Sequence, residues 1–193
     1  MAGFFRILSG VRRMDPDSFI PGPKVFYANH TSHLDFAVIW SALPSVERDR
    51  VRPVAGRDYW MKNRARRYVS SEIFKALLIE RQHVTRKNNP MEAMAVALEA
   101  GSSLIVFPEG TRGTRSKPVD FKPGLFHLHR DCPEIPLIPV HLQNLNRMMP
   151  KGAFLPIPLI THITFGVPVP DLPETKEAFL DKTLTALTQL NPI

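Results

Sequence analysis

The chain has 193 residues, of which 44 % are hydrophobic, and it carries a formal net charge of +7 and a single cysteine. This length and apolar content fit one globular domain with a proper core and exclude a disordered chain. One cysteine excludes an internal disulfide framework and a multi-cysteine zinc site, and it favours a reducing compartment.

Strands and helices are expected to alternate along the chain. In chain order, the pattern predicts a strand at 24–28, a helix at 34–43, a strand at 52–55, helical segments at 57–67 and 71–77, a strand at 78–80, a helix at 90–100, a strand at 104–107, a helix at 123–129, strands at 137–142 and 162–165, and a closing helix at 174–190. This alternation indicates a single α/β domain in which helices flank a largely parallel sheet.

The N-terminal segment leaves two interpretations open. No run of eighteen apolar residues occurs in the chain, so a transmembrane helix is not expected. Residues 1–11 mix five large apolar side chains with Arg6, and they are too short and too interrupted for a secretory signal. Residues 1–20 are interpreted either as an amphipathic helix on a membrane surface or as a helix that packs on the domain at 21–193.

A basic segment extends from Arg48 to Arg67. It contains eight Lys and Arg residues against two Asp residues, and aromatic residues are interleaved with them. Such a segment attracts polyanions, either nucleic acid or an anionic membrane surface. Charge alone is more typical of a solvated helix face.

The stretch YANHTSHLDF places a histidine and a carboxylate at the end of the first predicted strand. In an unbroken helix a step of five residues rotates by about 500°, so His30 and Asp35 would not share a face. His30 is therefore expected just before the helix and Asp35 in its first turn, with the carboxylate under the imidazole. Asp35 would then fix the tautomer and leave the other ring nitrogen to accept a proton. A purely structural explanation stays open, because Ser32 and Asp35 have the spacing of a capping box.

Two other chemistries are disfavoured at this stretch. His30, His33 and Asp35 faintly resemble a zinc cluster, but no further His or Asp follows at ligand spacing. A serine hydrolase is not expected, because the chain has no Gly-x-Ser-x-Gly elbow.

A second stretch, FPEGTRG at 107–113, begins at the end of the strand predicted at 104–107. That strand is an uninterrupted apolar run, as expected of a strand buried on both faces. Gly110 and Gly113 would let the backbone approach a ligand closely. Thr111 offers a hydroxyl, and Arg112 offers a planar fork suited to a phosphate. Glu109 repels an anion, so its expected task is to hold Arg112. An ordinary strand-end turn with a surface salt bridge explains these residues equally well.

Four stretches together resemble the glycerolipid acyltransferase family. NHTSHLD at 29–35 is similar to the family's Asn-His-x-Ser-x-x-Asp block, and FPEGTR at 107–112 to its Phe-Pro-Glu-Gly-Thr-Arg block. LIER at 78–81 resembles the intervening block that ends in Arg, and IPLIPV at 135–140 resembles the apolar, proline-bearing fourth block. The blocks occur in the family's order, and the resemblance is greatest to the bacterial 1-acylglycerol-3-phosphate acyltransferases.

The resemblance implies transfer of a fatty acyl group from a thioester, on coenzyme A or acyl carrier protein, to the free hydroxyl of a lysophospholipid, most simply 1-acylglycerol-3-phosphate. His30 would be the general base and Asp35 would orient it. The residues that the resemblance assigns to acceptor binding are Arg81, Glu109, Gly110, Thr111 and Arg112. No metal or cofactor is expected, since a thiol with a pKa of about 8.5 departs without a strong acid.

The implied chemistry changes the interpretation of the basic segment. It is expected to rest on anionic lipid at the cytoplasmic face of a membrane, and nucleic acid is not an expected partner, because no nucleic-acid motif accompanies the charge. Two alternatives remain: the same chemistry on another lysolipid acceptor, or a non-enzymatic membrane-surface binding protein that keeps the blocks as structure. The intact His30, Asp35, Glu109 and Arg112 argue against the second.

Overall fold

The computed structural model describes residues 13–14, 20–30, 32, 35–81, 84–85, 88–110, 120–143 and 162–191. Four residues singled out above, His33, Thr111, Arg112 and Gly113, lie outside these ranges. So does most of the segment 1–20 that was interpreted as a helix.

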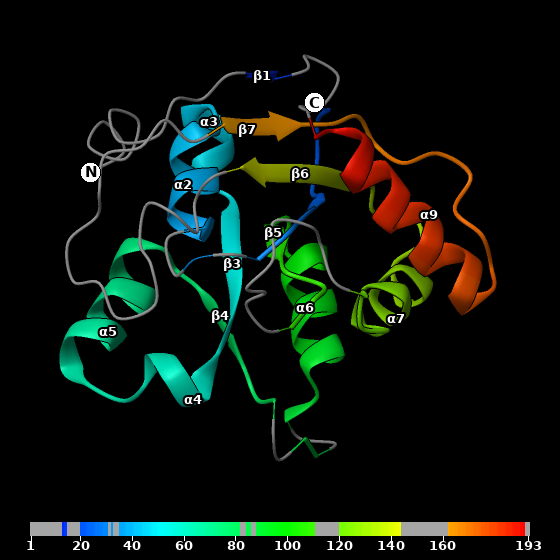
Figure 1. Cartoon of the computed structure of the whole chain (residues 1–193). Helices are drawn as coiled ribbons and strands as arrows, with labels where there is room; N and C mark the ends of the chain where they lie inside the picture. The colour runs from blue at the N-terminus through cyan, green and yellow to red at the C-terminus, as the bar shows by residue number, and fades with distance from the viewer. Residues whose placement is uncertain are drawn as a thin grey trace.

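The described residues form an α/β fold around one open sheet of seven strands in the order β1-β7-β6-β2-β5-β3-β4 (Figure 1). The strands are β1 (Arg13–Met14), β2 (Val25–Ala28), β3 (Val51–Gly56), β4 (Leu77–Ile79), β5 (Ser103–Val106), β6 (Leu137–Gln143) and β7 (His162–Phe165). Every pairing in this sheet is parallel except that of β6 with β7. The predicted α/β class with a largely parallel, mixed sheet is confirmed.

The helices follow the predicted order with three differences, one of which is a short helix at 45–48 that was not expected. They are α2 (Asp35–Ala42), α3 (Ser45–Arg48), α4 (Arg57–Trp60), α5 (Arg64–Tyr68), the π-helical turn η2 (Val69–Ile73), α6 (Pro90–Glu99), α7 (Gly124–Asp131) and α9 (Lys176–Gln189). The helix expected at 57–67 is broken, because Asn63 caps a new helix by accepting the backbone N–H of Arg66 at 2.8 Å. The helix expected at 71–77 ends early, because Lys75 adopts a left-handed backbone with φ of 47°.

Helices cover both faces of the sheet (Figure 1). Successive residues of β2 face opposite sides, so Phe26 packs in a cluster with α2, whereas Tyr27 packs in a cluster with α6, α7 and α9. Burial raises the pKa of Tyr27 far above its ordinary value. Its hydroxyl therefore stays protonated and donates to the backbone carbonyl of Thr183 in α9 at 3.0 Å.

The parallel strands bring three of the sequence blocks to one edge. Strands β2, β5, β3 and β4 are neighbours and run in the same direction, so their carboxyl ends lie along a single edge of the sheet. The chain leaves that edge at Asn29, Phe107, Arg57 and Glu80. Ligands of open α/β sheets bind at this edge. None of the helices in the described ranges is long and apolar enough to cross a membrane.

Candidate active site

His30 and Asp35 are in direct contact. His30 lies between the end of β2 and the start of α2, and its Nδ1 is 2.7 Å from Oδ2 of Asp35. The carboxylate is fully buried, whereas the imidazole is 22 % exposed. An ionised carboxylate only accepts hydrogen bonds, so the neutral imidazole carries its proton at Nδ1 and a lone pair at Nε2. The predicted contact between carboxylate and imidazole is confirmed.

Asp35 also caps the start of α2. The same oxygen, Oδ2, accepts the backbone N–H of Ser32 at 2.9 Å, and the backbone N–H of Asp35 donates to the carbonyl of Ser32 at 3.3 Å. The carboxylate therefore has both contacts that the sequence left as alternatives. Because the cap fixes the carboxylate relative to the backbone, the imidazole is fixed as well.

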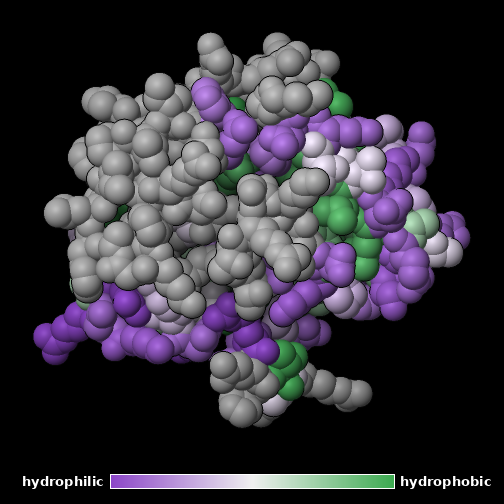
Figure 2. Space-filling model, viewed as in Figure 1, coloured by the Kyte–Doolittle hydropathy of each residue, from purple (hydrophilic) through white to green (hydrophobic). Residues whose placement is uncertain are grey.

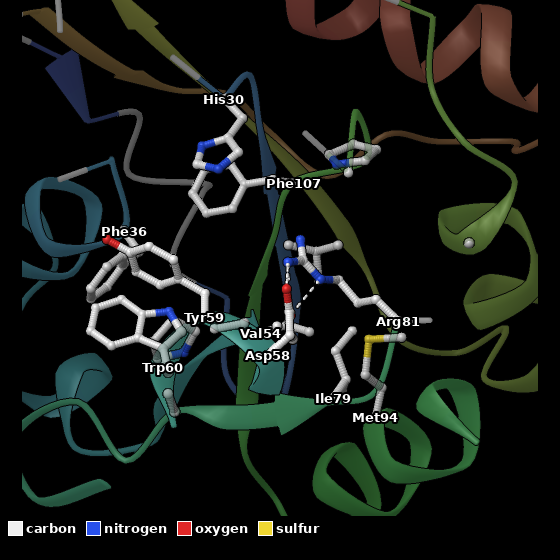
Figure 3. A pocket seen from close by; sticks show the side chains of 18 of the residues that line it. His30, Phe36, Val54, Asp58, Tyr59, Trp60, Ile79, Arg81, Met94 and Phe107 are labelled. Atoms are coloured by element: carbon white, nitrogen blue, oxygen red, sulfur yellow. Dashed lines mark hydrogen bonds and ion pairs between the residues drawn. The ribbon is translucent and has the colours of Figure 1, made fainter. Parts of the chain in front are cut away.

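Two residues from the turn after β5, Phe107 and Glu109, also contact His30. Glu109 is 6 % exposed, and its Oε1 accepts the backbone N–H of His30 at 2.9 Å. The ring of Phe107 stacks on the imidazole with centroids 4.3 Å apart and planes inclined by 24° (Figure 3). Glu109 was expected to hold Arg112, which lies outside the described residues. Local sequence spacing did not predict that Glu109 and Phe107 contact His30.

Asn29 joins the histidine loop to β6. Its amide donates to the carbonyl of Leu142 at 2.8 Å and accepts the backbone N–H of Leu142 at 2.8 Å. The regular pairing of β2 with β6 ends one residue earlier, at Ala28 with Val140. The side chain of Asn29 thus extends the ladder in place of the backbone, and it anchors the residue that precedes His30. Sequence reasoning gave Asn29 no task.

A cavity of about 440 Å³ lies beside His30. Figure 3 shows His30 and Phe107 at one side of it, and Phe36, Tyr59 and Trp60 at another. Apart from alanines and prolines, its apolar lining residues are Phe36, Val54, Tyr59, Trp60, Phe74, Ile79, Met91, Met94, Val106, Phe107, Leu125 and Leu128. Its charged lining residues are Asp58, Lys62, Arg81 and Lys122. A mostly apolar cavity with a few charged groups is typical of a small-molecule site.

Two of the predicted acceptor-binding residues lie in this wall. The guanidinium of Arg81 forms an ion pair with Asp58 at 2.8 Å. Gly110 has φ of +69°, which only glycine adopts freely, and a Cβ there would lie 2.9 Å from Cδ of Lys122. The cationic groups that a phosphate would meet in the described part of the wall are thus Arg81, Lys122 and Lys62. Within the same part of the chain, no group of three or more His, Cys, Asp or Glu residues is arranged to hold a metal ion.

The chain is similar to known proteins over most of its length. Residues 11–143 match the family model described as Acyltransferase. The chain is 30 % identical over 144 residues to a 1-acyl-sn-glycerol-3-phosphate acyltransferase of Limnanthes douglasii, which covers 70 % of this chain and 47 % of that protein. It is 27 % identical over 162 residues to Taffazin of Dictyostelium discoideum, which covers 78 % of this chain and 55 % of that protein.

The fold matches a solved structure. The crystal structure of the 1-acyl-sn-glycerophosphate acyltransferase PlsC from Thermotoga maritima superposes with a TM-score of 0.70 at 19 % identity, over 93 % of this chain and 71 % of that one. The chain spans about half the length of the two relatives from Limnanthes and Dictyostelium. Since the family model covers more than half of the chain, including the His30, Arg81 and Glu109 blocks, the protein belongs to the Acyltransferase family.

Proposed function

We propose that the protein transfers a fatty acyl group from an acyl thioester to the free hydroxyl of a lysophospholipid, most directly 1-acylglycerol-3-phosphate, which would give phosphatidate. The observation that carries this proposal is the His30–Asp35 contact beside an apolar cavity. The names of the relatives and the family membership support the same reaction class.

The proposed chemistry uses His30 as the base. An alcohol attacks poorly until its proton is removed, and Nε2 of His30 has no partner among the described residues and carries the lone pair. As Nε2 takes the hydroxyl proton, the oxygen attacks the thioester carbonyl and forms a tetrahedral intermediate. The intermediate collapses to the ester and a thiolate, which is a good leaving group because its thiol has a pKa of about 8.5. The buried carboxylate of Asp35 stabilises the imidazolium until His30 passes the proton to the departing thiolate, which restores the neutral base.

The cavity supports a lipid substrate. Twelve of its lining side chains are the apolar residues given above, and each methylene group that leaves water for such a wall contributes about 0.8 kcal/mol. The charged residues lie in the same wall, so an acyl chain and an anionic headgroup would each find a suited surface. This division fits an amphiphilic substrate better than a fully polar one.

Arg81 and Arg112 are proposed to bind the acceptor phosphate. Arg presents parallel N–H donors that match two phosphate oxygens, whereas Lys presents a point charge. Arg81→Lys and Arg112→Lys are each expected to raise the half-saturating concentration of lysophosphatidate about tenfold or more, with little effect on acyl-CoA hydrolysis in the absence of acceptor. Steady-state kinetics with varied acceptor checks this. If the changes alter the choice of donor and leave the acceptor response intact, the assignment is wrong.

One assay tests the function as a whole. Labelled acyl-CoA and acyl carrier protein thioesters are offered with a panel of lysolipids that differ only in headgroup. The proposal requires acylation, with lysophosphatidate preferred over lysolipids whose phosphate is already esterified. Faster acylation of the esterified lysolipids would favour the alternative acceptor class. Vesicle binding without acyl transfer from either donor would favour a non-enzymatic membrane-surface protein.

The proposed location is the surface of an anionic membrane, on its cytoplasmic side. Arg64 and Arg67 of α5 are exposed, Tyr68 beside them is 62 % exposed, and Tyr59 of the same region lines the cavity. Figure 2 shows a hydrophilic surface at the lower left, where α4 and α5 lie in Figure 1. Cations beside an amphipathic aromatic residue suit a headgroup region, and this segment would place the cavity next to the lipid.

Changing Arg64 and Arg67 together to Gln is expected to weaken binding to anionic vesicles by about 2 kcal/mol, roughly 30-fold, and added salt should weaken the native protein in the same direction. Arg66 is left in place because its guanidinium lies 4.2 Å from the ring centre of Tyr59. Vesicle sedimentation measures the effect. The matched control removes two cations from α7 and α9, Arg130 and Lys176, and should change binding little. Equal loss in both double variants would show that net charge, and not the α5 surface, drives binding.

A further inference from the structure

The ion pair between Arg81 and Asp58 occupies one edge of the guanidinium. Nη2 of Arg81 donates to Oδ1 and Oδ2 of Asp58 at 2.8 and 2.9 Å, and Nε donates to Oδ1 at 3.2 Å. Both side chains line the cavity that His30 also lines. Three hydrogen bonds fix the orientation of a side chain that otherwise has four rotatable bonds.

Gly56 leaves room for this ion pair to lie close to the backbone of β3. It is the last residue of β3 and pairs in register with Ile79 at the end of β4. A Cβ at Gly56 would lie 2.3 Å from Nε of Arg81 and 2.5 Å from Oδ1 of Asp58. The backbone of Gly56 has φ of −69° and ψ of 124°, a conformation that any residue adopts. Glycine is therefore required at this position by the close approach of the ion pair, and not by the backbone conformation.

The other edge of the guanidinium is open to the cavity. Asp58 uses the N–H groups on the Nε side, and no described residue accepts a hydrogen bond from Nη1. In Figure 3 the nitrogen that is not bonded to Asp58 points away from it, towards the side of the cavity where His30 lies. The remaining N–H groups of Nη1 and Nη2 form a second fork that matches two oxygens of a phosphate.

We propose that Asp58 is a positioning residue for the acceptor. Its carboxylate holds the guanidinium of Arg81 so that the Nη1–Nη2 edge faces the phosphate of the lysolipid. Gly56 leaves the space that this ion pair needs. This rests on the proposed function, in which Arg81 binds that phosphate. Asp58 also balances the charge of Arg81, so the pair selects an anion by directed donors and not by net positive charge. Without Asp58, the side chain of Arg81 would adopt several rotamers and would lose that freedom when phosphate binds. This loss of entropy would weaken phosphate binding.

Two variants remove the positioning in different ways. Asp58→Asn keeps the shape but loses the charge, and Gly56→Ala pushes the ends of both side chains apart while the backbone is unstrained. Each is expected to raise the half-saturating lysophosphatidate concentration by about 3- to 10-fold, with turnover at saturating acceptor and acyl-CoA hydrolysis nearly unchanged. Asp49→Asn, which removes an exposed carboxylate after α3, is the matched control and should have no effect.

The decisive experiment combines these changes with Arg81→Lys. If Asp58 acts through Arg81, Asp58→Asn adds no further loss in the Arg81→Lys background. Binding of a short-chain lysophosphatidate below its micelle concentration, measured by calorimetry, gives the same comparison without catalysis. Thermal melts confirm that each variant is folded.

The outcomes separate this inference from the function on which it rests. If the native protein acylates lysophosphatidate and Arg81→Lys weakens acceptor binding, but Asp58→Asn and Gly56→Ala do not, the positioning role is overturned and the function stands. Additive losses in the double variant also overturn it. If Arg81→Lys has no effect on acceptor binding, the role of Arg81 falls and that of Asp58 falls with it, whereas the acyl-transfer assay of the native protein still decides the function.

Discussion

His30→Ala is expected to lower turnover by about 10²- to 10⁴-fold, which is the usual effect of removing a positioned acid–base group. The variant should still fold, because the imidazole is partly exposed and its ring contacts are with Phe107 at the cavity wall. The affinity for lysophosphatidate should change little, since the proposed phosphate contacts come from other residues. Turnover with saturating donor and acceptor, beside a thermal melt, measures both expectations.

His33→Ala is the matched control for this change. The two histidines lie three residues apart, but only His30 stands at the His of the Asn-His-x-Ser-x-x-Asp block, whereas His33 stands at a position that the block leaves open. His33→Ala should therefore retain most of the turnover. Two folded variants with equal loss would show that the base has been assigned to the wrong histidine.

Asp35→Asn separates catalysis from capping. The amide oxygen of Asn can still accept the N–H of Ser32, and Asn caps helices about as well as Asp, so the melting temperature should stay nearly the same. The amide cannot stabilise an imidazolium, and it no longer enforces a proton on Nδ1 of His30. The expected result is a folded protein whose turnover is lower by about 10²- to 10⁴-fold.

The outcome of this test is read from two measurements together. Unchanged stability with a large loss of rate supports the proposed catalytic pair. If the stability and the rate both stay close to those of the native protein, Asp35 serves only the helix cap. If the stability falls steeply, a lower rate can result from unfolding alone, and Asp35→Glu then provides the comparison. Glu restores the charge but displaces the carboxylate oxygens. This variant should therefore recover less of the rate than of the stability.

Local sequence determined most of the elements and the contact at the centre of the candidate site. The sequence pattern predicted six strands of the sheet within two residues at each end. For β2, β5 and β6 the signal was a continuous apolar run, as expected of strands buried on both faces. The His30–Asp35 contact was predictable for a related reason. The two residues are five apart, and the start of α2 between them sets their geometry without help from distant parts of the chain.

The tertiary structure decided everything that depends on the order of the strands. Glu109 and Phe107 reach His30 only because β5 pairs with β2, although the residues are more than seventy positions apart. Arg81 meets Asp58 because β4 pairs with β3, and Gly56 allows it. Asn29 reaches Leu142 across 113 positions because β6 is the other neighbour of β2. The physical reason is that side-chain spacing along the chain encodes helices, strands and short turns, whereas the order of strands in a parallel sheet follows from the packing of all the helices and strands together.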